Sequence, residues 1–123
     1  MKKMRIAVGI LTALAMTCPA VLAKAYNDKD AEQGNIHFNN RNFSKGQKSC
    51  NDCHPKGRGL SAAGTKTTFA VMGGAQKSLE EVINYCLVNA NKGEALDIQS
   101  KEMKELVNYI KMLGDQVAPG YGK

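Results

Sequence analysis

Length, composition and charge restrict the chain to one small domain. It has 123 residues, with 17 Lys and Arg against 11 Asp and Glu, four Cys, three Pro and no Trp. This length fits a single compact domain and excludes an enzyme with a separate substrate domain. With 43% apolar and 23% charged residues, the composition is that of an ordinary globular protein and excludes a disordered or collagen-like chain.

The first 23 residues have the pattern of a secretory signal peptide. Three basic residues lie within the first five positions, an apolar run follows from Ile6 to Met16, and small residues end at Ala23. Because a bilayer-spanning helix needs about 20 apolar residues, we expect cleavage near Ala23 rather than a retained anchor. The sequence therefore predicts a periplasmic protein of residues 24–123, with no stable membrane insertion after cleavage.

The charge beyond this leader is mild but uneven. The leader holds three of the 17 basic residues and no acidic one, so residues 24–123 have a net charge of +3, too little to suggest nucleic-acid binding. Seven basic residues lie between positions 41 and 77, where Asp52 is the only acid. This basic collar predicts a docking face for an acidic partner or, alternatively, an ordinary solvated surface. Its members are Arg41, Lys45, Lys48, Lys56, Arg58, Lys66 and Lys77.

The segment from Cys50 to His54 carries the clearest chemistry. Its pattern, C-x-x-C-H, is typical of covalent attachment of c-type haem. Two thiols at this spacing at the start of a helix can add to the two vinyl groups of haem, and the adjacent imidazole then lies beneath the iron. A thioredoxin-like pair would need a βαβ pattern, and a zinc site would need four ligands, to which only His37 and Cys86 could contribute. The sequence therefore predicts one covalent haem c on Cys50 and Cys53, with His54 as the proximal iron ligand.

Caps and apolar periodicity predict three helices, in an all-α domain without a competing strand pattern. The first begins at Asn27 or Asp28 and ends near Asn39, the second spans 78–93, and the third spans 100–114. The segment 57–74, rich in Gly, Thr and Lys, is predicted to be a loop that wraps around something other than its own core.

This order of features resembles the small class I c-type cytochromes over essentially all of residues 24–123. In that family, a Gly and an aromatic residue on the first helix pack against a Leu and an aromatic residue on the last. Gly34, Phe38, Leu106 and Tyr109 match these positions. The resemblance implies the cytochrome c fold, with three main helices and loops around one haem. It also implies a one-electron carrier that docks with redox partner proteins.

The sixth iron ligand departs from that family's pattern, because the loop before the last helix contains no Met. Cys86 lies on the inward, apolar stripe of the second helix and is the leading candidate, with Met72 as the next. Packing of Cys86 in the core, with another ligand or none, stays open. Met103 is predicted to fill the core, and Met112 to lie on the opposite, surface face of the last helix.

The stretch from Val82 to Met103 is similar to the cysteine-ligated haem domains of bacterial thiosulfate-metabolising cytochromes. This similarity implies that Cys86 binds iron opposite His54. It also keeps a second function open, a haem redox enzyme or subunit acting on thiosulfate or a related sulfur compound. Electron transfer is the favoured prediction, because so short a chain has little surface left for a substrate cavity. His37 is predicted to be a helix residue rather than a ligand, and the run 56–59 to contact a haem propionate or remain solvated.

Overall fold

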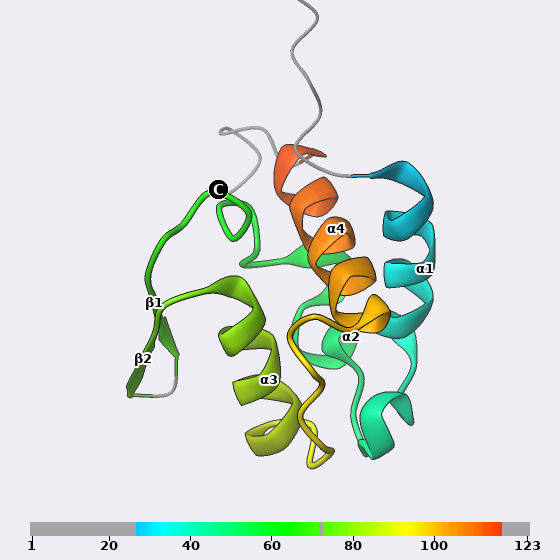
Figure 1. Cartoon of the computed structure of the whole chain (residues 1–123), viewed down its shortest axis with the longest axis vertical. Coiled ribbons are helices and arrows are strands. Elements are labelled where there is room, and N and C mark those ends of the chain that lie inside the picture. The colour runs from blue at the N-terminus through cyan, green and yellow to red at the C-terminus, as the bar shows by residue number, and fades with distance from the viewer. Residues whose placement is uncertain (1–26, 72, 117–123) are drawn as a thin grey trace, which may run out of the picture.

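The computed structural model describes residues 27–71 and 73–116, which are mostly helical. In chain order the elements are α1 (Asp28–Asn39), the 3-10 turn η1 (Phe43–Lys45), α2 (Cys50–Cys53), the 3-10 turn η2 (Pro55–Gly57), β1 (Phe69–Val71), β2 (Gly74–Gln76), α3 (Leu79–Asn89) and α4 (Lys101–Gln116) (Figure 1). The predicted signal peptide and Met72 lie outside the described residues. Among the helices of the described part, none is long and apolar enough to cross a bilayer.

Both long terminal helices begin at the predicted caps. The Asn27 side chain accepts hydrogen bonds from the backbone N–H groups of Lys29 and Asp30, at 3.0 and 3.2 Å, and starts α1. Ser100 Oγ accepts from the Met103 N–H at 3.2 Å at the start of α4. A side-chain oxygen at this position satisfies an N–H group that has no partner within the helix, which explains why these boundaries were predictable.

Helices α1 and α4 lie side by side and build the core (Figure 1). Gly34 lies so close to α4 that an added Cβ would overlap the Glu105 carbonyl oxygen. Phe38 meets Tyr109 edge to face, with ring centroids 5.1 Å apart. Leu106 is fully buried beside them. The predicted packing of these four residues is therefore confirmed, and Gly34 is needed because the two backbones approach at this point.

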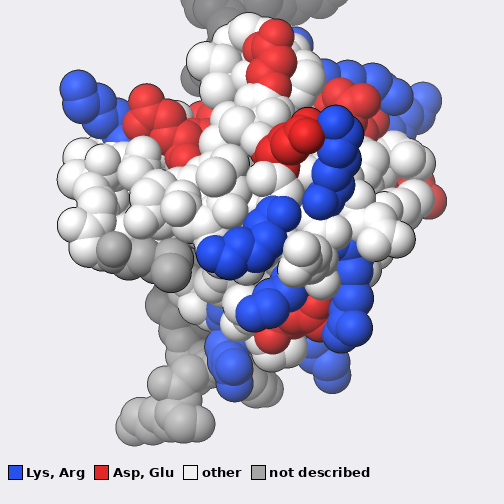
Figure 2. Space-filling view, turned by 90° about the horizontal axis from the view of Figure 1, so that it is seen from below, with Lys and Arg blue, Asp and Glu red and all other residues white. Residues whose placement is uncertain are grey.

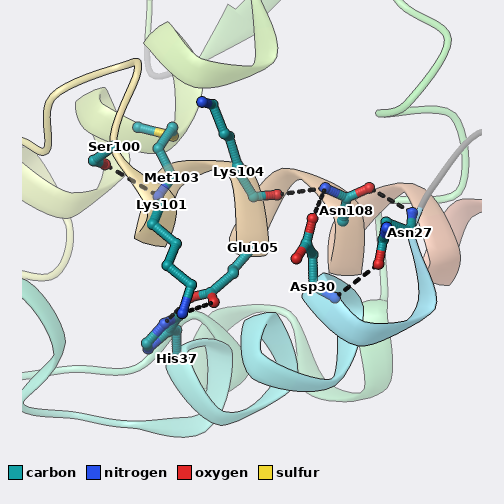
Figure 3. A network of polar contacts seen from close by, with 9 residues as sticks. All are labelled: Asn27, Asp30, His37, Ser100, Lys101, Met103, Lys104, Glu105 and Asn108. Atoms are coloured by element: carbon teal, nitrogen blue, oxygen red, sulfur yellow. Dashed lines mark hydrogen bonds and ion pairs between the residues drawn. The ribbon is translucent and has the colours of Figure 1, made fainter.

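A polar network also joins the two helices (Figure 3). The side chain of Glu105, only 4% exposed, lies 2.8 Å from His37 Nε2 and 3.2 Å from Lys101 Nζ. At the other end of the contact, the Asn27 N–H donates to Asn108 Oδ1 at 2.7 Å. These contacts pair the buried carboxylate with two donors, as a charge removed from water requires.

The helix α3 begins as predicted but ends earlier. Ser78 Oγ accepts from the Glu81 N–H and caps its start. Its last residue is Asn89, not a residue next to Gly93, because the chain turns at Lys92, which has a left-handed backbone with φ of 60°. The Gly93 N–H then donates back to the Leu87 carbonyl at 2.8 Å.

Two short strands lie within the segment that was predicted to be loop. Strands β1 and β2 pair antiparallel, with Phe69 opposite Gln76 and Val71 opposite Gly74. The expectation of a loop without strands over 57–74 was wrong here. Each strand has three residues, too few for a periodicity of two to stand out in the sequence. Phe69 is buried, so the hairpin contributes to the core.

A second contact closes the fold between segments 44–47 and 91–94. The Gln47 N–H donates to the Asn91 carbonyl at 2.7 Å, and the Glu94 N–H donates to the Ser44 carbonyl at 2.8 Å. Ser44 and Lys45 have positive φ angles of 50° and 57°. The left-handed turn at these residues brings the segment before α2 against the segment after α3.

Candidate functional site

The short helix α2 sets the spacing of the two predicted attachment cysteines. Ser49 Oγ accepts from the Asp52 N–H at 3.2 Å, and the Asp52 carboxylate accepts from the Ser49 N–H at 2.9 Å. This capping box fixes the start of the helix, on which Cys50 and Cys53 are its first and last residues. Residues three apart on a helix share a face, so the two thiols point to the same side.

The imidazole of His54 is held in one orientation directly after α2. Its Nδ1 lies 2.9 Å from the Arg58 carbonyl oxygen, which can only accept a hydrogen bond. Nδ1 therefore carries the proton, and Nε2 keeps its lone pair for a metal. Gly59, with φ of 83°, turns the chain beside the ring.

All four predicted site residues line one cavity of about 500 Å³. Cys50 and Cys53 belong to α2, His54 follows α2, and Cys86 belongs to α3. Most of the remaining wall is apolar: Phe38, Leu60, Ala63, Phe69, Ala70, Val71, Leu79, Val82, Ile83, Leu87, Ala90, Leu106 and Ile110. A cavity of this size, largely apolar with a few convergent polar groups, is typical of a cofactor site.

The electrostatics of the thiols reflect this burial and their proximity. Burial raises the pKa of the Cys50 thiol to about 11, and the nearby Cys86 thiol adds to the shift. Burial likewise raises the pKa of Cys86, with a smaller contribution from Cys53. As free thiols, Cys50 and Cys86 would hold their protons near neutral pH, so binding of a metal by Cys86 requires loss of a proton.

The other sequence candidates lie elsewhere. Met103 is fully buried in the core, as predicted, and it is not part of the cavity wall. Met112 is half-buried against the core, so the prediction of a surface position was wrong. His37 lies outside the cavity, on the Glu105 network. Within the described ranges, no three His, Cys, Asp or Glu side chains are grouped to hold a metal ion.

Two cavity residues were missed by sequence reasoning. Asn91 is buried, with 5% of its surface exposed, and interaction with its side chain partly offsets the rise in the pKa of the Cys50 thiol. Lys66 also lines the cavity, whereas of the run 56–59 only Gly59 does. No local pattern marks Asn91 or Lys66, because each reaches the cavity through the path of its loop.

The basic collar is interrupted by acidic partners. Arg41 Nη2 lies 2.9 Å from Asp52 Oδ1, and Lys45 Nζ lies 2.9 Å from Glu94 Oε1. Figure 2 shows Lys and Arg side chains spread over the face seen from below, with acidic side chains among them. Two of the seven collar residues are therefore partly neutralised.

The fold and the cavity together define a class of protein. A helical domain in which the C-x-x-C-H thiols and imidazole line one largely apolar cavity has the donor set and the space that a c-type haem requires. The arrangement is that of a small c-type cytochrome domain.

Comparison with known proteins narrows this class. Residues 33–117 match the family described as SoxA/TsdA, cytochrome c domain, and the chain belongs to that family. No significant match was found among curated proteins or solved structures. Membership confirms the predicted likeness to thiosulfate-metabolising cytochromes. It implies covalently bound haem c, haem-based electron transfer and redox partners.

Proposed function

We propose that the chain is a periplasmic one-electron carrier that holds a single haem c in the 500 Å³ cavity. The observation that carries this proposal is the convergence of Cys50, Cys53, His54 and Cys86 on that cavity. Bound haem supplies a one-electron couple between ferric and ferrous iron. Export rests on the signal-peptide pattern of residues 1–23.

Cys50 and Cys53 form the covalent attachment. Each thiol would hold the haem through a thioether bond to one vinyl group, by an addition that keeps the thiol hydrogen in the product. The addition is redox-neutral and needs no external oxidant. The capping box of α2 supports this role, because it holds the two thiols at a fixed spacing before attachment.

His54 and Cys86 would both hold the iron of the bound haem. The Arg58 carbonyl fixes the His54 tautomer and leaves Nε2 to bind the metal. Cys86 supplies its sulfur as a thiolate after losing its proton. An anionic thiolate stabilises ferric iron, so we expect a low reduction potential.

Optical spectra of both redox states test the ligand assignment. Cys86→Met should raise the potential and introduce the weak band near the red end of the ferric spectrum that Met ligation gives. Val82→Ala is the matched control, because Val82 is also half-buried on α3 and lines the cavity. If Cys86→Ala, like Val82→Ala, leaves the spectrum and the reduction potential unchanged, Cys86 packs in the core without binding iron. Met72 then becomes the next residue to test.

Attachment is tested independently of ligation. The mass of the purified protein should equal residues 24–123 plus one haem, and the haem should remain bound after denaturation in acid. His54→Ala should abolish the native low-spin spectrum while the thioether bonds stay intact. Haem that can be extracted with acidic organic solvent would contradict the proposal as a whole.

Docking is proposed to involve an acidic face of the redox partner. Support comes from the collar residues Lys48, Lys56 and Arg58, for which the described part of the chain offers no ion-pair partner. Their charge would steer a transient encounter, as is usual for redox partners with small interfaces.

A second candidate function is redox chemistry on a sulfur compound such as thiosulfate. It is favoured by family membership and by a third thiol, Cys86, in the same cavity as the haem-binding motif. Turnover of thiosulfate by the purified protein with an artificial electron acceptor would support this function. If the purified protein does not turn over thiosulfate, electron transfer remains as its proposed function.

A further inference from the structure

The cavity wall has few polar groups, and most of them belong to the predicted haem-binding residues or already interact with another side chain. A haem presents an apolar macrocycle to such a wall, but it also carries two propionate carboxylates on the edge away from its vinyl groups. Of the polar wall residues beyond the predicted attachment motif and Cys86, Asn91 is buried and its side chain interacts with the Cys50 thiol. The two that remain are Lys66 and Thr68.

Lys66 and Thr68 lie at the open side of the cavity. Both are exposed, and both belong to the segment that leads into β1. Lys66 is the one Lys, Arg, Asp or Glu among the described residues of the wall. No ion pair within residues 27–71 and 73–116 involves it.

We propose that the Lys66 ammonium and the Thr68 hydroxyl form the propionate-binding edge of the cavity, an inference that rests on the haem site proposed above. Lys56 and Arg58, the propionate contacts considered from the sequence, are not part of the wall. Cys50 and Cys53 would hold the vinyl groups of the haem, and Lys66 and Thr68 would hold its propionates where solvent is accessible.

This contact has an electrostatic consequence for the iron. The Lys66 ammonium offsets propionate charge near the metal and so favours the reduced state. It also keeps the propionate deprotonated, because an adjacent cation lowers the pKa of a carboxyl group. Because Lys66 is exposed, solvent and salt screen the effect, and its size should be that of a surface ion pair.

The test is the reduction potential as a function of pH for Lys66→Gln in the haem-loaded, full-length protein. At low ionic strength we expect the equilibrium constant for reduction to fall about two- to fivefold. The pH at which the potential begins to depend on protonation should move upward. Lys66→Arg should restore both properties, and Thr68→Val should shift the potential in the same direction by less.

Lys77→Gln is the matched control, since Lys77 is also exposed, follows β2 and lies outside the cavity wall. It removes the same charge without removing the proposed contact. A Lys66→Gln potential and pH profile equal to those of Lys77→Gln would overturn the propionate assignment. Absence of covalent haem from the wild-type protein would instead overturn the proposed function, so the two failures are distinguishable. If Lys66→Gln does not fold, the Thr68→Val profile decides the question by the same comparison with Lys77→Gln.

Discussion

Replacing Gly34 by Ala should destabilise the protein, although Ala is the better helix former. An added Cβ would overlap the Glu105 carbonyl oxygen and lie 2.7 Å from Tyr109 Cβ, where carbon atoms normally sit about 3.5–4.0 Å apart. The obstacle is the backbone of α4, so no side-chain rotation relieves it, and the two helices must move apart. Overpacking of this kind costs up to about 3 kcal/mol, against a gain of about 1 kcal/mol in helix propensity. The free energy of unfolding should fall by about 2 kcal/mol, and the Tm by about 10 °C.

Denaturant unfolding of the haem-loaded protein measures this difference. Gln33→Ala is the matched control, because Gln33 is the adjacent, exposed residue of α1 and should tolerate Ala with a change of about 0.5 kcal/mol or less. The haem spectrum of Gly34→Ala should also change, since Phe38 and Leu106 belong both to this helix contact and to the cavity wall. Equal stability of Gly34→Ala and Gln33→Ala would refute the close-approach argument.

Three further predictions concern charges and hydrogen bonds elsewhere in the domain. Burial raises the pKa of the Glu105 carboxyl, but hydrogen bonds from His37 and Lys101 lower it by more, so the pKa is below its ordinary value. The contribution of Glu105 to stability is therefore present above about pH 4.3 and is lost as the pH falls through the folded-state pKa. Glu105→Gln should flatten the acid side of a plot of unfolding free energy against pH. An unchanged curve would contradict this prediction. Asn84→Ala should lower the free energy of unfolding in denaturant by about 1–2 kcal/mol, because the Asn84 side chain donates to and accepts from the Leu96 backbone at 2.8 Å. The control Asn89→Ala removes only an exposed hydrogen bond within α3 and should lower it by clearly less. If the basic collar steers an acidic redox partner, electron-transfer rates with it should fall steeply between about 0.01 and 0.15 M salt, and a flat profile would leave the collar as a solvated surface.

The helix starts were predictable from sequence because capping is a local interaction. Asn27, Ser78 and Ser100 each accept a hydrogen bond from an N–H group two or three residues further on, so a short window contains the whole signal. The end of α3 was harder to predict, because Lys92 rather than Gly93 adopts the left-handed turn. Propensity favours Gly there, but contact of the following backbone with Ser44 and Gly46 determines the observed turn.

The candidate site was partly predictable for the same reason. The C-x-x-C-H motif is a local pattern, and Cys86 followed from the apolar stripe of its helix. Asn91 and Lys66 reach the cavity only through long-range contacts, since the Gln47–Asn91 backbone bond and the path into β1 have no signature in a sequence window. The hairpin was missed because its three-residue strands pair mainly through their backbones.

The two backbone bonds between segments 44–47 and 91–94 also bear on how the cavity opens. Gln47 lies three residues before Cys50, and Asn91 lies five residues after Cys86, so the bonds fasten both walls that carry thiols. Neither wall can move far while the other stays in place. The amides of Gln47 and Glu94 should therefore exchange with deuterium at one common rate, through a single cooperative opening that exposes both segments together.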